Sequence, residues 1–239
     1  MASKGTGAGK TFESEGYLLH RVPYGESDVI ATFLTATHGK LGMVARGARR
    51  SSRRFQGVLE PLSTVRLTYE DRGRELCTLK EGRVTVPRTR IMEDLDALEA
   101  AGKALRFVRA LCPPRTPEPD VMQGLTTLLD ALQEGRPTQA ELLRFSFALL
   151  TGVGYGLELS RCLRCGKPRP ADRPAYVDPD KGGVVCASCG GGKFLLPVEL
   201  LAEAERLALG EPVELSDLHI ATLLRVAEEA IVAHAGVEA

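Results

Sequence analysis

The chain has 239 residues, of which 44% are hydrophobic and 26% are charged, and its 31 Lys and Arg balance 31 Asp and Glu. This composition is ample for buried cores in one large domain or in two to three small ones, and it excludes a disordered chain. The sequence contains no run of about eighteen apolar residues and no apolar secretory signal near its start, so we expect a cytoplasmic protein without a membrane segment.

The first residues resemble a nucleotide-binding loop. Residues 4–11 read KGTGAGKT and end in the Gly-Lys-Thr of the pattern G-x-x-x-x-G-K-[ST]. However, Lys4 replaces the first glycine, the three residues before it are too few for a strand, and residues 12–19 read as an extended segment rather than a helix. We therefore interpret residues 1–11 as a flexible leader, and we expect no nucleotide cofactor.

Residues 12–86 read as five short strands. The candidate strands lie at residues 17–22, 29–35, 41–45, 64–69 and 75–81. They are rich in β-branched and aromatic residues, and turn signals such as Pro23-Tyr-Gly-Glu-Ser and Asp71-Arg-Gly-Arg separate them. Five strands without an intervening helical period predict a small closed β-barrel, for which the OB-fold is the five-stranded precedent.

The charges are unevenly divided, and the excess of cations falls on this barrel. Residues 1–90 hold sixteen Lys and Arg against nine Asp and Glu, a net charge of +7, whereas residues 91–239 hold fifteen against twenty-two, a net charge of −7. Such an asymmetry indicates that the basic part contacts a polyanion.

An Arg-rich connection follows the third candidate strand. No acidic residue occurs between Asp28 and Glu60, and glycines and serines separate the cations in that window. We interpret the segment as a flexible loop that grips a phosphate backbone, with Tyr24, Phe33 and Phe55 as candidates for stacking on unpaired bases. The candidate nucleic-acid contacts are Lys40, Arg46, Arg49, Arg50, Arg53 and Arg54, and Arg74 with Lys80 and Arg83 extends the path on the next hairpin.

From Val86 onward the apolar residues recur at helical spacing. Five helices are predicted, from Ile91 to Pro113, and over residues 119–133, 137–152, 197–209 and 216–234. Ser216 is a good N-cap for the last of them. The pattern predicts a helical domain in two parts, residues 87–156 and 193–239, on either side of a Gly- and Pro-rich insert at residues 157–192.

The insert contains two paired cysteine motifs, 162-CLRCG-166 and 186-CASCG-190. The four thiols of Cys162, Cys165, Cys186 and Cys189 have the spacing C-x2-C-x20-C-x2-C. Two residues between thiols let one tight turn aim both sulfurs at one ion, and the glycine after each pair supplies backbone freedom. Four thiolates fill a tetrahedral site, so we predict one structural Zn²⁺ and no catalytic metal.

Other uses of paired cysteines fit less well. A redox C-x-x-C would occur once beside a βαβ pattern, and a zinc deaminase would need H-x-E and P-C-x-x-C, which this sequence does not have. An iron–sulfur cluster takes the same four ligands, and the spacing alone leaves it open.

Residues 15–50, EGYLLHRVPYGESDVIATFLTATHGKLGMVARGARR, resemble the N-terminal signature of the bacterial RecO family of DNA repair proteins. Residues 61–81 are similar to the family's later strands, and the four-cysteine insert within helices matches the part that follows. The resemblance implies an α+β multidomain fold with an N-terminal five-stranded OB-fold, a helical domain and an embedded zinc ribbon.

The resemblance also implies a non-enzymatic recombination mediator. Such a protein binds single- and double-stranded DNA, anneals complementary strands, engages RecR and the tail of single-strand-binding protein, and helps to load RecA. We expect it in the cytoplasm, associated with the nucleoid, and we expect the acidic tail to contact Lys103, Arg106 and Arg109 on the first helix. From the residues alone, an RNA-binding or translation-associated protein stays an alternative, as does a metal-dependent or nucleotide-using enzyme.

Overall fold

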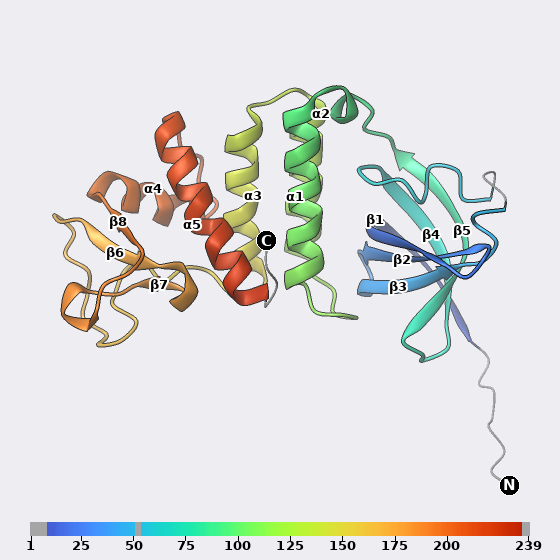
Figure 1. Cartoon of the computed structure of the whole chain (residues 1–239), viewed down its shortest axis with the longest axis horizontal. Coiled ribbons are helices and arrows are strands. Elements are labelled where there is room, and N and C mark those ends of the chain that lie inside the picture. Colours follow the sequence, from blue (N-terminus) through green and yellow to red (C-terminus); the bar gives the residue numbers. More distant parts are fainter. Residues whose placement is uncertain (1–8, 51–53, 236–239) are drawn as a thin grey trace, which may run out of the picture. The chain divides into compact units, whose positions relative to one another are not determined.

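The structure is a computed structural model and describes residues 9–50 and 54–235. The chain divides into two compact units, one rich in strands and one rich in helices (Figure 1). The first unit comprises Met1–Thr89 with Cys112–Met122, and the second comprises Arg90–Leu111 with Gln123–Ala239.

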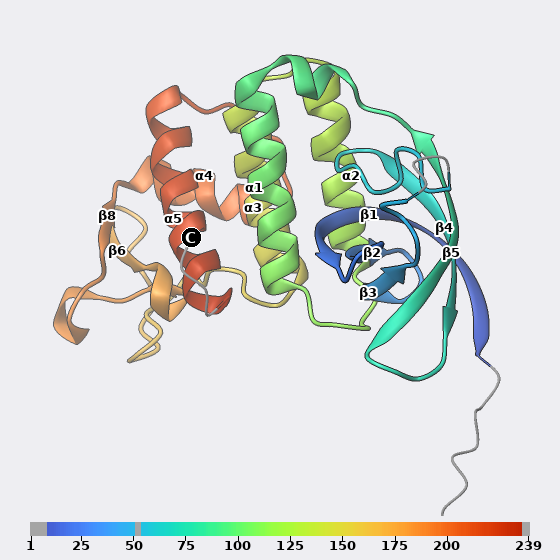
Figure 2. The ribbon, with the colours of Figure 1, turned by 45° about the vertical axis from the view of Figure 1, so that its right-hand side comes forward.

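The first unit is a closed five-stranded barrel. Its strands are β1 (Lys10–Tyr24), β2 (Asp28–Thr35), β3 (Gly39–Ala45), β4 (Thr64–Asp71) and β5 (Leu76–Val86). They follow one another around the barrel in the order β1-β2-β3-β5-β4, and β4 pairs with β1 to close it. All pairs are antiparallel except β3 with β5, and the long β4 and β5 run side by side in Figure 2. This is the OB-fold topology, so the predicted fold class is confirmed.

The strands alternate between a buried and a solvent-facing row. In β3, Leu41, Met43 and Ala45 are buried, whereas the residues between them are only partly buried. The same alternation places Phe33 in the barrel core at 0% exposure, and Phe55 packs beneath the barrel at 4%. The prediction that these two rings stack on bases is therefore wrong, because neither has a free face, and only Tyr24 of the three is exposed.

The leader predicted over residues 1–11 is too long, because the first strand already begins at Lys10. Lys10 and Thr11 belong to β1, where they pair with Asp71 and Glu70 of β4. Hydrogen bonds of the sheet hold these two residues against β4. In a nucleotide-binding loop the same two positions would begin a helix, whereas here they lie in a strand. Residues 4–8 of the KGTGAGKT stretch lie outside the described residues.

One segment assigned from the sequence to the helical domain belongs to the barrel unit instead. Residues 112–122 return to the barrel, where the Arg115 guanidinium forms an ion pair with Asp71 at 2.6 Å and the backbone N–H of Arg115 donates to the carbonyl of Lys40. Arg115 holds the pKa of the Asp71 carboxyl below its usual value. At Gly39, whose φ is +64°, a Cβ would overlap the carbonyl oxygen of Thr116, so the close approach of this segment requires glycine.

The second unit is a helical bundle that carries a small sheet. Its helices are α1 (Leu95–Leu111), α2 (Pro119–Gln133), α3 (Thr138–Gly152), α4 (Val198–Ala208) and α5 (Asp217–Ala235), with the first turn of α2 assigned to the barrel unit. In Figure 1, α3 lies beside both α1 and α5. The hydroxyl of Ser216 accepts the N–H of His219 at 3.3 Å, which confirms the predicted N-cap of α5.

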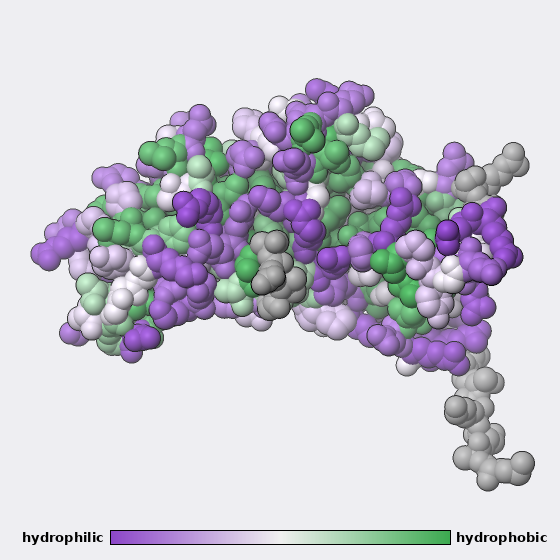
Figure 3. All heavy atoms as spheres, viewed as in Figure 1, coloured by the Kyte–Doolittle hydropathy of each residue, from purple (hydrophilic) through white to green (hydrophobic). Residues whose placement is uncertain are grey.

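The start of α1 differs from the sequence prediction. Asp94 interrupts the expected helix and caps α1 by accepting the N–H of Ala97 at 3.1 Å, after a short 3₁₀ turn at Arg90–Glu93. The buried face of α1 includes small residues such as Ala101 and Ala104. Leu95, the first residue of α1, is 68% exposed. Exposed apolar side chains of this kind appear as green among the purple hydrophilic surface in Figure 3. Within the described ranges, the helices are too short or too polar to cross a membrane.

Candidate metal centre and basic groove

The paired cysteines lie in a small ribbon module of the helical unit. Its sheet has the order β7-β6-β8, with β6 (Ala175–Asp178), β7 (Gly183–Val184) and β8 (Phe194–Leu196). Because β8 pairs with β6, the module extends to Leu196, beyond the boundary at residue 192 that the sequence predicted.

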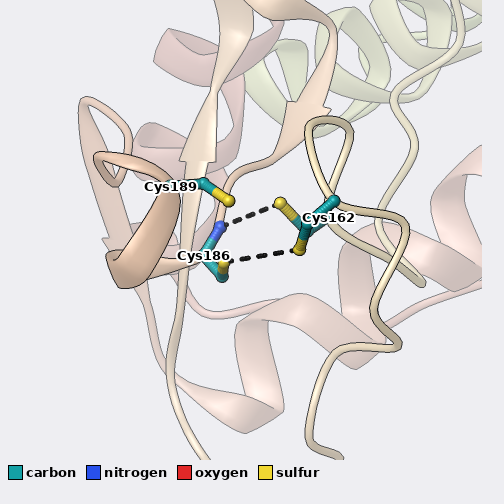
Figure 4. A group of neighbouring side chains, drawn as sticks. Cys162, Cys186 and Cys189 are labelled. Atoms are coloured by element: carbon teal, nitrogen blue, oxygen red, sulfur yellow. Dashed lines mark hydrogen bonds between the residues drawn. The ribbon is translucent and has the colours of Figure 1, made fainter.

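Two loops of this module bring the four thiols of Cys162, Cys165, Cys186 and Cys189 together. All four sulfur atoms lie within 4.8 Å of one another, and Figure 4 shows labelled cysteines of both loops directed toward a common point. The Sγ atoms of Cys165 and Cys186 are 3.8 Å apart. A tetrahedral ion with metal–sulfur bonds of about 2.3 Å places its ligands roughly 3.8 Å apart, so the cluster has the dimensions of one four-thiolate site.

Each cysteine pair sits on a tight turn that ends at a glycine. In the first turn, the Gly166 N–H donates to the carbonyl of Cys162 at 2.8 Å, and in the second the Gly190 N–H donates to that of Ala187 at 3.1 Å. The φ angles of these glycines are +70° and +109°, a region that residues with a Cβ rarely adopt. The role that the sequence predicted for the two trailing glycines is thus confirmed.

The electrostatics of the thiols favour a cation at their centre. The N–H of Cys186 donates to the Cys162 sulfur at 3.4 Å and, with the N–H of Cys165, lowers the pKa of that thiol to about 6. The hydrogen bond with Cys186, followed by the other nearby thiols, raises the pKa of Cys189 to about 12. All four thiols therefore ionise together only when a positive ion compensates their mutual repulsion, and soft thiolates suit Zn²⁺ or an iron–sulfur cluster.

The remaining two cysteines stand apart from this cluster. Cys77 and Cys112 are both 1% exposed, and burial raises the pKa of each thiol. A protonated, buried thiol behaves as a small apolar core residue and not as a ligand.

A second candidate site is a basic groove on the outer face of the barrel, about 520 Å³ in volume. It lies along the parallel pair of β3 and β5, where Gly42 pairs with Leu76 and Ala45 pairs with Leu79. This register places the second half of β3 beside the first residues of β5, which directly follow the turn after β4. The cations that line the groove are Arg46, Arg54, Arg72, Arg74 and Lys80.

Two carboxylates, Glu70 and Glu75, also line the groove, and Glu70 contacts two of its cations. Glu70, whose side chain is 12% exposed, accepts hydrogen bonds from Arg72 at 2.8 Å and from Lys80 at 2.7 Å. These two partners, Arg72 first, lower the pKa of Glu70 to about 2. Two of the groove's cations therefore already have an anionic partner, and an incoming phosphate competes with Glu70 for Arg72 and Lys80.

The structure gathers only part of the predicted basic set in this groove. It unites Arg46, Arg54 and Arg74, whereas Arg49 donates to the carbonyl of Gly25 at 3.2 Å and Arg50 pairs with Glu26 at 3.6 Å. Lys40 and Arg46 lie at opposite ends of β3, about 20 Å apart along an extended strand. Arg53 lies outside the described residues.

The first residues of the connection after β3 are held by hydrogen bonds to the turn between β1 and β2 and to the start of β2, whereas the sequence predicted a flexible loop. The N–H of Gly47 donates to the Asp28 carboxylate at 2.8 Å, and the N–H of Arg49 donates to the carbonyl of Ser27. The carboxylate pKa of Asp28 is lowered by the bond from Gly47. These bonds fix the backbone direction of Arg46 and Arg49.

Two groove residues were not found from the sequence. The sequence prediction assigned Glu70 to no site, and it placed Arg72 only in the turn Asp71-Arg-Gly-Arg. Their spacing of two residues, which places side chains on one face of an extended segment, was the available signal. Lys80 was noted only as an extension of the path.

The predicted partner contact lies on α1. Lys103 forms an ion pair with Glu228 of α5 at 2.7 Å, so its ammonium is already engaged. Arg106 is exposed and Arg109 is half-buried. The three residues lie on one helix, as the sequence predicted, and their spacing of three places them on one side of it.

Comparisons with known proteins cover both units. Residues 10–88 match the family model described as "Recombination protein O N terminal", and residues 92–236 match "Recombination protein O C terminal". The chain is similar to the DNA repair protein RecO of Anaeromyxobacter sp. (strain K), with 37% identity over 74% of this chain and 70% of the relative. It is 35% identical to that of Anaeromyxobacter dehalogenans (strain 2CP-C) over 94% of this chain and 85% of the relative. It is 37% identical to that of Geobacter sulfurreducens over 74% of this chain and 72% of the relative.

Proposed function

The chain belongs to the recombination protein O family, which acts in DNA repair and recombination, and on that premise we propose that it is a DNA-binding recombination mediator. It binds single- and double-stranded DNA, anneals complementary strands, and with RecR helps to load RecA onto DNA coated by single-strand-binding protein. It performs these steps by binding alone, without covalent chemistry, in the cytoplasm at the nucleoid.

The observation that carries this proposal is the basic groove of the barrel. Five cations of the described part of the chain line a single groove of about 520 Å³, and their side chains have the reach and charge to neutralise successive phosphates. Annealing requires two like-charged strands to approach, so partial neutralisation of one strand lowers the repulsion of the second. Contacts of this kind are largely independent of base sequence, as a general mediator requires.

We assign the ion of the ribbon module as one structural Zn²⁺ held by the four cysteines. Four protein ligands complete its coordination and leave no position for water or substrate, and the ion's contribution is to fold the module. For the acidic tail of single-strand-binding protein we retain Arg106 and Arg109, with Lys103 held by Glu228. The affinity of a tail peptide for the Arg106→Ala/Arg109→Ala chain tests this contact.

Strand annealing is the direct test of the proposed function. The purified chain, without any nucleotide, is expected to accelerate the pairing of two complementary oligonucleotides at low salt and to lose this effect as salt rises, because screening weakens the phosphate contacts. Fluorescence quenching between labelled strands follows the reaction. A chain that binds neither strand at low salt, or that prefers single-stranded RNA when both polymers compete, would contradict the proposal.

Glu70→Gln is expected to raise the affinity for single-stranded DNA by a few-fold, because Arg72 and Lys80 then lose their internal anion and become available to phosphate. With a folded-state pKa of about 2, Glu70 is charged throughout the range from pH 5.5 to 8, so the gain should not vary over that range. Fluorescence anisotropy measures it.

Glu81→Gln is the matched control, since Glu81 is an exposed carboxylate on β5 that does not line the basic groove. An equal gain in the control would show that only net charge matters. A loss of affinity in Glu70→Gln would show that Glu70 positions the cations rather than competing for them.

A further inference from the structure

The acidic part of the chain contains one basic segment. Residues 91–239 hold fifteen Lys and Arg against twenty-two Asp and Glu. Within them, residues 161–173 hold five cations and a single acid, which leaves ten cations against twenty-one acids for the remainder. This segment of net charge +4, in surroundings of net charge −11, forms the first half of the ribbon module. Such segregation is not expected of a merely solvated surface of mixed sign.

One of the five cations anchors the segment. The side chain of Arg169 is 9% exposed, forms an ion pair with Glu205 of α4 at 2.7 Å and donates to the carbonyl of Leu159 at 2.9 Å. The other four, Arg161, Arg164, Lys167 and Arg173, are exposed. The segment is thus fixed to the helices through one arginine and presents the others to solvent.

Lys167 and Arg173 share a groove beside the cysteine cluster. This groove is about 290 Å³ in volume and is also lined by Tyr176. Arg173 has only a long contact of 3.9 Å with Asp172, which is itself exposed. Arg164, on the adjacent cysteine turn, donates one guanidinium N–H to the carbonyl of Cys189 at 3.1 Å, and the residue is exposed.

The backbone of the groove favours phosphate over a peptide. Lys167, Arg169 and Arg173 each directly precede a proline, and all three prolines line the groove. Proline stiffens the chain and biases the residue before it to an extended conformation, so little backbone entropy is lost when the cations bind. Proline also has no N–H, so this wall offers few backbone donors to the main chain of an extended peptide. Phosphate binding by long cationic side chains does not require such backbone donors.

Tyr176 gives the groove an aromatic surface. A Cβ on Gly191 would lie 3.4 Å from the ring, so the backbone of Gly191 packs against the tyrosine and orients it. The half-buried ring also lines the groove between the cations. An aromatic ring held beside cations is the combination with which proteins bind single-stranded nucleic acid.

We propose that the ribbon module carries a second nucleic-acid contact, in which Lys167 and Arg173 bind phosphates and Tyr176 stacks on an unpaired base. Arg161 and Arg164 continue the basic surface along the cysteine turn. This contact is separate from the basic groove of the barrel and uses residues that the barrel does not contain.

The test is the double variant Lys167→Ala/Arg173→Ala in the full-length protein, with a thirty-nucleotide oligo(dT) as probe and salt varied from about 50 to 200 mM. Two lost contacts to a single strand are expected to reduce the slope of log affinity against log salt by about 1.4, and to raise the Kd at low salt on the order of tenfold. The matched control is Lys181→Ala/Lys193→Ala, whose ammonium groups pair with Asp178 and Asp180. The control is expected to bind as the unaltered protein does.

The same pair of substitutions in an Arg46→Ala/Arg54→Ala/Arg74→Ala background separates the two sites. A further loss in that background supports a second contact, even if the barrel variant alone binds normally and the barrel assignment fails. An unchanged slope and Kd in Lys167→Ala/Arg173→Ala would overturn the inference, as would an equal loss in the control. Loss of poly-glutamate binding without loss of oligo(dT) binding would assign the groove to an acidic peptide instead. Metal content and thermal midpoint verify that each variant is folded.

Discussion

Cys162→Ala is expected to release the metal ion and to unfold the ribbon module. Cys162 is 2% exposed, and its sulfur lies within 4.8 Å of the three other thiols. The strands of the module have four, two and three residues, too few to bury a core that would hold without the ion. Structural zinc supplies small modules with about 10–16 kcal/mol of apparent binding free energy, all of which is coupled to folding.

Three measurements follow this loss. Metal analysis should fall from one ion per chain to nearly none, limited proteolysis should cleave within residues 157–196, and calorimetry should show a lower or divided transition. We expect the defect in DNA binding to follow from the loss of folding.

Cys112→Ala is the control, because Cys112 is equally buried but belongs to the barrel unit and lies outside the thiol cluster. It should cost about 1–2 kcal/mol of stability and keep the ion. A Cys162→Ala protein that is soluble, resistant to protease and fully loaded, yet deficient in DNA binding, would reverse the order of events that we expect.

Replacing Arg46, Arg54 and Arg74 together by alanine is expected to weaken binding of single-stranded DNA by about two orders of magnitude at low salt. The three arginines line one groove, and among the described residues the other cations that line it are Arg72 and Lys80, which Glu70 already engages. Three lost phosphate contacts should reduce the slope of log affinity against log salt by about 2. Anisotropy titrations at several salt concentrations measure both quantities.

Arg66→Ala is the control for this variant. Arg66 is an exposed arginine of the same barrel, pairs with Glu15 at 3.0 Å, and does not line the basic groove. It should change the affinity less than about twofold. If instead Arg49→Ala/Arg50→Ala abolished binding while the triple variant bound normally, the interface would lie at the turn between β1 and β2.

The elements that the sequence predicted best are those with local signals. The second helix runs over Pro119–Gln133 as predicted, because proline at its first position and Gly135 just beyond its end mark both limits in the sequence itself. The four-cysteine cluster was likewise predicted, since the spacing within each pair fixes a turn and the repeated pair supplies the partner.

The features that were missed depend on residues far apart in the chain. Arg115 pairs with Asp71, which lies 44 residues away in the chain, and the spacing of apolar residues in the sequence does not predict such a pair. The basic groove depends on the register of β3 against β5, which decides that Lys80 lies beside Arg46 and that Lys40 does not. Phe33 was predicted to stack on bases, and only the closure of the barrel shows that its face of β2 is the interior.

The return of residues 112–122 to the barrel affects how the protein folds during synthesis. The strands of the barrel end at Val86, yet the ion-pair partner of Asp71 is Arg115 and the backbone packed against Gly39 is that of Thr116. While the ribosome is still making α1, the nascent barrel therefore has its sheet but lacks the contacts of residues 112–122. It completes these contacts only after one helix of the other unit has been synthesised. A fragment cut after Thr89 should accordingly be less stable than the barrel of the intact chain, whereas a fragment that extends to Met122 contains both the barrel and residues 112–122.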